Sequence, residues 1–87
     1  MRKIRLSNGD EFEVRRCGAD EQQLRLTLIT ARSVLDTIML FGYPENTRRI
    51  EHYFEGTETD HHVYEGYTAL TAVSAEGNDI SVVLQKP

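Results

Sequence analysis

Residues 3–14, KIRLSNGDEFEV, decide the fold. Apolar and charged side chains alternate on both sides of a Ser-Asn-Gly centre, which is typical of two half-buried strands joined by a tight turn. A two-residue Asn-Gly turn would put the apolar side chains of the two strands on opposite faces. A three-residue loop that ends with Gly9 in the left-handed conformation instead sets Ile4 opposite Phe12. The same register sets Arg5 opposite Glu11 and Lys3 opposite Glu13, so the sequence predicts a bulged antiparallel hairpin.

The rest of the chain repeats the strand pattern, with one exception. Alternation or β-branched and aromatic enrichment predicts further strands at residues 24–28, 48–55, 63–64, 67–74 and 80–85. Polar segments that contain glycine or aspartate predict connections at 17–22, 56–60 and 76–79. The exception lies between the third and fourth strands, where the apolar period becomes helical.

The expected helix begins after Ser33, since Ser33 and Asp36 have the spacing of a capping box. It ends at Gly42, and Pro44 should prevent its continuation. About two turns of helix need tertiary support, so the apolar stripe should dock on the sheet. That stripe consists of Val34, Leu35, Ile38, Met39 and Phe41, and we expect Met39 and Phe41 in the core.

These elements predict a mainly β fold of the α+β class. We expect a small antiparallel sheet or barrel of six or seven strands, with one short helix between strands 3 and 4 and a single β-rich domain over residues 1–87. Leu, Ile, Val and Phe occupy 22 of the 87 positions, above the roughly 20% below which chains tend to stay disordered. One core is therefore the limit for this chain.

The charge distribution is uneven. The formal net charge is −4, with +2 on residues 1–32 and −6 on residues 33–87. An acidic total makes nucleic acid an improbable partner, because phosphate binding needs a clustered basic face. The asymmetry allows head-to-tail self-association, but opposite charges from the two halves could also meet inside one fold.

The sequence favours an intracellular protein. The longest uncharged apolar run, residues 38–41, is too short to cross a bilayer, and the basic start leads into a polar turn rather than an apolar signal segment. Cys17 is the only cysteine, so no internal disulfide can form. We expect neither membrane attachment nor secretion.

No catalytic pattern is recognisable. His52, His61 and His62 lack metal-ligand spacing, because adjacent strand residues point to opposite faces. Cys17 has no histidine near it in the sequence, and no glycine-rich phosphate loop is present. We therefore expect no enzyme activity, no cofactor and no metal.

The run Tyr64-Glu65-Gly66-Tyr67-Thr68 is the most distinctive stretch. It fits a β-bulge in which Gly66 kinks a strand and the tyrosines cover the missing side chain. It also fits a tyrosine-lined contact surface, because tyrosine is favoured where a partner buries its ring. Both interpretations stay open.

This stretch, the short helix with its Pro44 stop, and the closing segment ISVVLQK (80–86) resemble small uncharacterised proteins of phages and prophages in Firmicutes-type bacteria, some of them in tail or structural gene clusters. The resemblance covers roughly the last 50 residues. It implies a virion or tail assembly component, located in the bacterial cytoplasm or in the virion.

We therefore expect a non-enzymatic structural or adaptor domain that acts by protein–protein contact, with a protein partner or by self-association. The expected contact residues are Tyr53, Tyr64, Tyr67 and Val83, the last on a final strand that could form a free sheet edge. The alternative is a small binding module that presents the three tyrosines beside Arg48 and Arg49 to a ligand or a nucleic-acid end.

Overall fold

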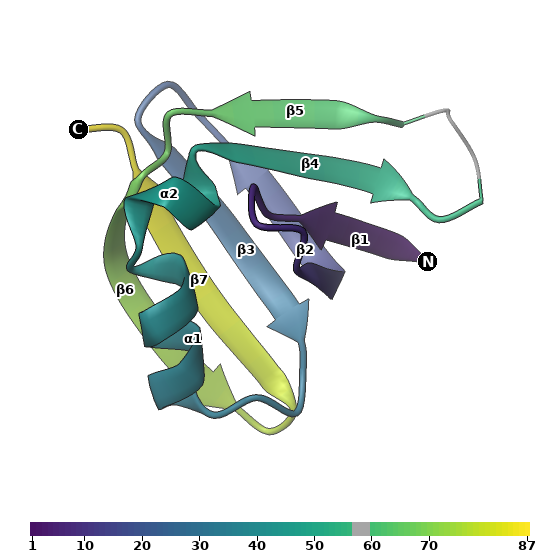
Figure 1. The fold of residues 1–87 in the computed structure, drawn as a ribbon. Coiled ribbons are helices and arrows are strands. Elements are labelled where there is room, and N and C mark those ends of the chain that lie inside the picture. The colour runs from purple at the N-terminus through teal and green to yellow at the C-terminus, as the bar shows by residue number, and fades with distance from the viewer. Residues whose placement is uncertain (57–59) are drawn as a thin grey trace.

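A computed structural model describes residues 1–56 and 60–87 (Figure 1). Seven antiparallel strands form one sheet in the order β5-β4-β1-β2-β3-β7-β6. The strands are β1 (Arg2–Arg5), β2 (Glu11–Ala19), β3 (Gln23–Ile29), β4 (Arg49–Phe54), β5 (His62–Glu65), β6 (Ala69–Glu76) and β7 (Asp79–Gln85). The predicted mainly β class, strand number and helix between β3 and β4 are confirmed. Part of the turn expected at 56–60 lies outside the described residues.

The opening hairpin has the predicted register. Ile4 pairs with Phe12, Lys3 with Glu13 and Arg5 with Glu11. Gly9 has a φ of 95°, and its N–H donates to the carbonyl of Leu6 at 3.0 Å. The predicted three-residue loop that ends at Gly9 is therefore confirmed.

β2 is longer than expected. Residues 17–19, predicted as part of a connection, continue β2 and pair with the first residues of β3. The register of the two strands shifts between Val14 and Arg16, which marks a bulge at Arg15. The inserted residue restores the inward facing of Cys17, a change of parity that alternation alone could not reveal.

The sheet is strongly bent but open. Figure 1 shows β5, β4 and β1 crossing above β3, β7 and β6, with the long β2 passing between the two halves. Only residues 66–68 connect the two edge strands, so the ends of the sheet approach at one corner. Of the two predicted architectures, the structure has the open sheet rather than the closed barrel.

One hydrophobic core fills the bend. It is made mainly of alternate residues from the five strands β1, β2, β3, β4 and β7, together with two residues from connections and the helix residue Phe41, all buried. Its members are Ile4, Leu6, Phe12, Val14, Leu24, Leu26, Leu28, Phe41, Ile50, Tyr67, Ile80, Val82 and Leu84. The strict alternation of Leu24, Leu26 and Leu28 is why β3 could be assigned from the sequence.

Two helices follow β3. Helix α1 (Val34–Phe41) is capped at Ser33, whose hydroxyl accepts the N–H of Asp36 at 3.1 Å, as predicted. Gly42 ends it and donates its N–H to the Ile38 carbonyl at 2.8 Å. The second helix, α2 (Pro44–Thr47), was not predicted. Pro44 occupies its first turn, where the missing N–H costs nothing, so this proline starts a helix as well as stopping one.

The set of α1 side chains that point toward the core differs from the prediction. Phe41 is buried as expected, but Met39 is 70% exposed and Leu35 is 65% exposed. The buried polar residue on the inner face is Thr37, whose hydroxyl donates to the Ser33 carbonyl at 2.9 Å. Because its hydroxyl is hydrogen-bonded, Thr37 can occupy the core side of the helix, where we had expected larger apolar residues. The apolar stripe of α1 is therefore largely uncovered.

The final strand is not an edge. β7 lies between β3 and β6, so the prediction that residues 80–85 form an exposed sheet edge is wrong. The edges are β5 and β6. Neither described helix is long and apolar enough to cross a membrane.

Candidate functional site

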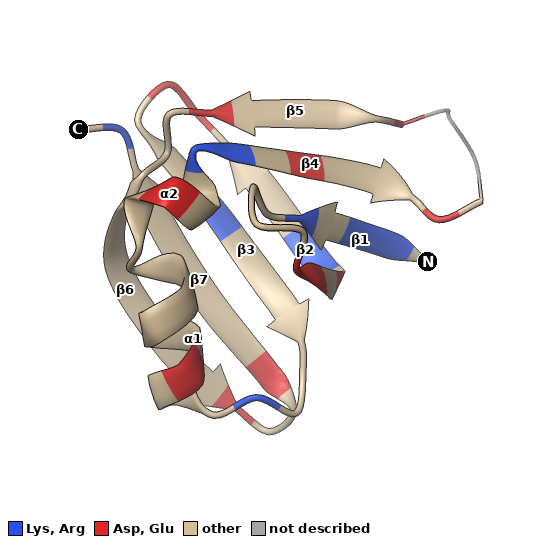
Figure 2. Cartoon of the chain, in the orientation of Figure 1, with Lys and Arg blue, Asp and Glu red and all other residues tan. Residues whose placement is uncertain are grey.

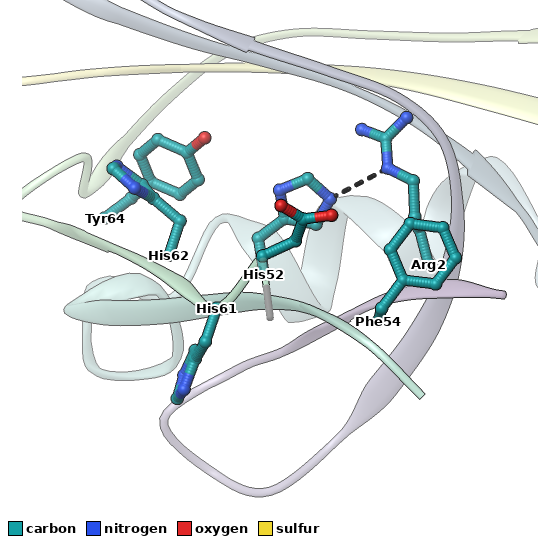
Figure 3. Close-up of a pocket in the computed structure, with 7 residues that line it drawn as sticks. Arg2, His52, Phe54, His61, His62 and Tyr64 are labelled. Carbon is teal, nitrogen blue, oxygen red and sulfur yellow. Dashed lines mark hydrogen bonds between the residues drawn. The ribbon is translucent and has the colours of Figure 1, made fainter. Parts of the chain in front are cut away.

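The first candidate is a hollow on the inner face of β1, β4 and β5, beyond the end of the core. Register places its residues there, since Arg2 pairs with Phe54 and His52 pairs with His62 across neighbouring strands. The hollow has a volume of about 500 Å³ and is also lined by Tyr64 (Figure 3). We call it the histidine hollow.

A cation–imidazole hydrogen bond sets the charge of the histidine hollow. The Arg2 Nε donates to His52 Nε2 at 3.1 Å, as the dashed line in Figure 3 shows. Because this nitrogen accepts, His52 is neutral and carries its proton on Nδ1. Burial, followed by the charges of Arg2 and His62, holds the pKa of His52 below its usual range.

Tyr64 links the histidine hollow to the core. The Cys17 Sγ donates to its hydroxyl at 3.6 Å, and the ring of His62 lies 4.6 Å from the tyrosine ring. Burial and this hydrogen bond raise the pKa of Tyr64 to about 12. Burial also raises the pKa of the Cys17 thiol. Cys17 packs against the hydrophobic core.

All three histidines line the histidine hollow, but their side chains do not converge on one point. His61 turns away from His52 and His62 in Figure 3, and its Nε2 lies 3.2 Å from the Glu51 carboxylate. Within residues 1–56 and 60–87, no group of three potential ligands could hold a metal ion.

The predicted tyrosine surface is divided among three environments. Tyr67 is buried, and its hydroxyl donates to the Asp20 carbonyl at 2.7 Å. Its ring meets Tyr64 edge to face, with centroids 6.2 Å apart. Gly66, between them, has a φ of 84° and lies in the connection that ends β5 rather than in a bulge within one strand.

Tyr53 lies on the opposite face of β4 from Tyr64, because its neighbour His52 faces the histidine hollow. Its hydroxyl donates to the Glu11 carboxylate at 2.7 Å, and the Arg5 guanidinium lies 5.1 Å from its ring centroid. Val83 is half-buried on the inner strand β7. These residues therefore do not form a single stacking platform with Arg48 and Arg49.

The oppositely charged halves of the chain meet within the fold. Lys3 pairs with Glu55 at 3.1 Å, and Arg15 pairs with Asp79 at 2.9 Å. Figure 2 shows the basic positions of β1 beside the acidic positions of β2 and β4. The internal pairing that we left open is thus present in the structure.

The second candidate is the surface formed by α1 and the edge strand β6, which we call the α1–β6 edge. It comprises Leu35, Ile38 and residues 70–76. Met39 extends it on the outward side of α1, where it lies beside Arg32, Asp36 and Asn46. Ile38 is 43% exposed and lines a shallow groove of about 220 Å³ with residues 70–73. Figure 1 shows α1 standing beside β6 at this end of the sheet.

Exposed apolar side chains concentrate at this edge. The large hydrophobic residues that the described chain exposes are Met1, Leu35, Ile38, Met39 and Tyr43. All except Met1 belong to α1 or to the residues that directly follow it. Single exposed apolar residues are ordinary, but a contiguous group marks an interaction site.

The neighbouring edge strand, β6, has almost no charged residues that would discourage pairing with another strand. β6 reads ALTAVSAE, with no proline, no lysine and one charged residue at its end. In the part of the chain that the structure describes, its backbone bonds to β7 alone. Such an edge offers unpaired N–H and C=O groups to another strand.

Sequence reasoning missed the α1–β6 edge because it assumed that every apolar residue of a short helix faces the core. Three of the five stripe residues that it assigned to packing form this surface instead. The sequence feature that could have indicated an exposed apolar surface is the width of the apolar stripe around the helix. Positions 34, 35, 38, 39 and 41 cover more of a helix than one sheet contact can bury.

Comparison with known proteins gave no relative: no family model, curated protein or solved structure matches this chain.

Proposed function

We propose that this chain is a non-enzymatic structural or adaptor domain that acts by protein–protein contact through the α1–β6 edge. The observation that carries the proposal is the joint exposure of Leu35 and Ile38 beside a strand edge without charged protection. Fully burying one such side chain is worth roughly 1.5–3 kcal/mol. A partner that covers both would gain this energy together with main-chain hydrogen bonds.

We propose a phage or prophage origin for this domain. The resemblance to small phage proteins that we expect from the last part of the sequence leads us to propose a role in virion or tail assembly, with the protein in the bacterial cytoplasm or in the particle. Assembly components work by repeated contacts, often between copies of one chain. The role needs no cofactor, membrane or nucleic acid.

Sedimentation equilibrium of the purified chain tests the proposal. We expect the wild type to self-associate, and to do so at high as well as low salt, because the contact is apolar and screening affects it little. The double variant Leu35→Glu/Ile38→Glu should raise the dissociation constant at least about tenfold. Both residues are exposed, so the variant should keep its fold.

A matched control variant separates the loss of the apolar surface from the effect of the added negative charge on association. Arg16→Glu makes the same change of net charge, −2, on an exposed residue of β2, a strand that pairs with β1 and β3 and not with β6. It should associate like the wild type. A wild type that stays monomeric at millimolar concentration, or equal weakening by both variants, would contradict the proposal.

A further inference from the structure

We infer that the partner at the α1–β6 edge is a second copy of this chain, related by a two-fold axis through Ser74 and paired antiparallel, β6 against β6. The inference rests on the proposed function and adds the partner, the symmetry and the register. Four features of β6 and α1 support it.

The turn after β6 fixes which backbone groups are free. Gly77 has a φ of 61° in the two-residue turn between β6 and β7, the pattern of a type II′ hairpin. In such a hairpin the closing pair, Glu76 and Asp79, is hydrogen-bonded, and bonded and non-bonded pairs then alternate. Val73 and Ala75 therefore direct their N–H and C=O groups away from β7, toward the open edge.

These two residues select the register. The pairing of β6 with β7 is irregular between Leu70 and Ala72, so the regular part of the edge is residues 72–76. With the axis at Ser74, Val73 of each copy lies opposite Ala75 of the other, and both residues exchange both hydrogen bonds. An axis at Val73 would instead bring Ala75 against the irregular position Thr71.

The two-fold rotation through Ser74 also brings the apolar face of α1 toward the second copy. Val73 pairs with the buried Val82, so its side chain marks the core side of β6, and α1 lies on this side beside residues 70–73. A two-fold axis perpendicular to the sheet keeps both helices on one side of the joined sheet. With the axis at Ser74, residues 70–73 of the two copies lie about 17 Å apart along the strands, so Ile38 of each copy, beside residues 70–73, lies at the level of Ala75 and the following turn of the other.

Charge favours the antiparallel arrangement. Residues 69–75 carry no charge, so nothing repels its own image at the axis. Glu76 of one copy lies opposite Ala72 of the other, which separates the two carboxylates by about 14 Å along the strand, more than the Debye length of about 8 Å.

The other edge is a poorer partner for β6. β5 has four residues, His62–Glu65, and its inner face carries His62 and Tyr64 of the histidine hollow. In a head-to-tail contact the apolar face of α1 would meet these polar groups. The self-pairing buries apolar side chains against apolar side chains, so the assembly closes as a dimer.

Disulfide trapping tests the geometry. In the Cys17→Ser background, Ser74→Cys puts a thiol on the axis, where the paired Cα atoms would lie about 4.5 Å apart, within the range of a disulfide. Glu65→Cys puts a matched exposed thiol on the other edge. Under mild oxidation we expect Ser74→Cys to form the covalent dimer at least about tenfold faster than Glu65→Cys, because its thiols meet at an effective concentration in the millimolar range.

The outcomes separate the geometry from the proposed function. If the chain sediments as a dimer but Ser74→Cys cross-links no faster than Glu65→Cys, the two-fold β6 pairing is wrong and the contact function stands. A mixed disulfide between the two variants that exceeds either self-disulfide would show head-to-tail association and also overturn the inference. If the chain is monomeric by sedimentation, the proposed function itself fails.

Discussion

The ring of Phe41 in α1 packs against the ring of Phe12 in β2, with centroids 5.5 Å apart and planes inclined by 48°. Both side chains are buried, so this pair joins the helix to the core of the sheet. Two residues away, Met39 points into solvent. Two positions of the same helix turn thus differ, since Phe41 is buried in the core and Met39 is exposed.

Phe41→Ala should lower the free energy of unfolding by about 3–5 kcal/mol, because it leaves a cavity in a closely packed core. Met39→Ala on the same helix should change it by less than about 0.5 kcal/mol. Urea denaturation of both variants, at a concentration where the chain is monomeric, measures the difference. Equal costs at the two positions would mean that α1 is not oriented as described.

Gly9→Val should destabilise the fold by about 1 kcal/mol or more, because valine must adopt a positive φ. A Cβ at Gly9 would meet nothing within 4 Å, so the cost comes from the backbone conformation and not from a steric contact. Gly9→Asn is the control, since asparagine tolerates this conformation better. Chemical denaturation in which Gly9→Val matches the wild type would refute the bulged hairpin.

His52 should make the fold less stable in mild acid. Its native pKa lies below the ordinary value of 6.5, so as the pH falls through this value the unfolded chain takes up a proton that the native chain resists. The groups that face His52 are Arg2, His62 and Asp60. Protonation would also remove the acceptor of the Arg2 hydrogen bond.

The variant His52→Gln keeps an acceptor for Arg2 and removes the titration. Its free energy of unfolding relative to the wild type should therefore improve between about pH 7.5 and about pH 5. Urea denaturation at the two values gives this difference. A difference that does not change with pH would show that His52 is not held neutral by its surroundings.

Much of the fold could be predicted because its signals are local. The parity of the opening hairpin, the alternation of the leucines in β3 and the cap at Ser33 each depend on residues close in sequence, and each was correct. Strand order was not accessible in this way. Nothing within β7 distinguishes an edge strand from an inner strand, since its alternating pattern serves either position.

The α1–β6 edge escaped prediction for a related reason. Periodicity indicates that a face of α1 is apolar, but only the position of β6 shows whether the sheet can cover that face. Thr37 shows the converse, because a polar residue reached the interior through a bond to the backbone at Ser33. Burial of single positions in a small domain thus depends on tertiary contacts that the pattern does not contain.

Hydrogen exchange of β6 tests the central claim most directly, because it reads the edge itself. The amide groups of Val73 and Ala75 face away from β7 and should exchange rapidly in dilute solution. We expect both to become protected as the protein concentration rises, while Ser74, already bonded to β7, changes little. If Val73 and Ala75 exchange freely at every concentration at which the chain associates, the contact does not involve β6 and this account is wrong.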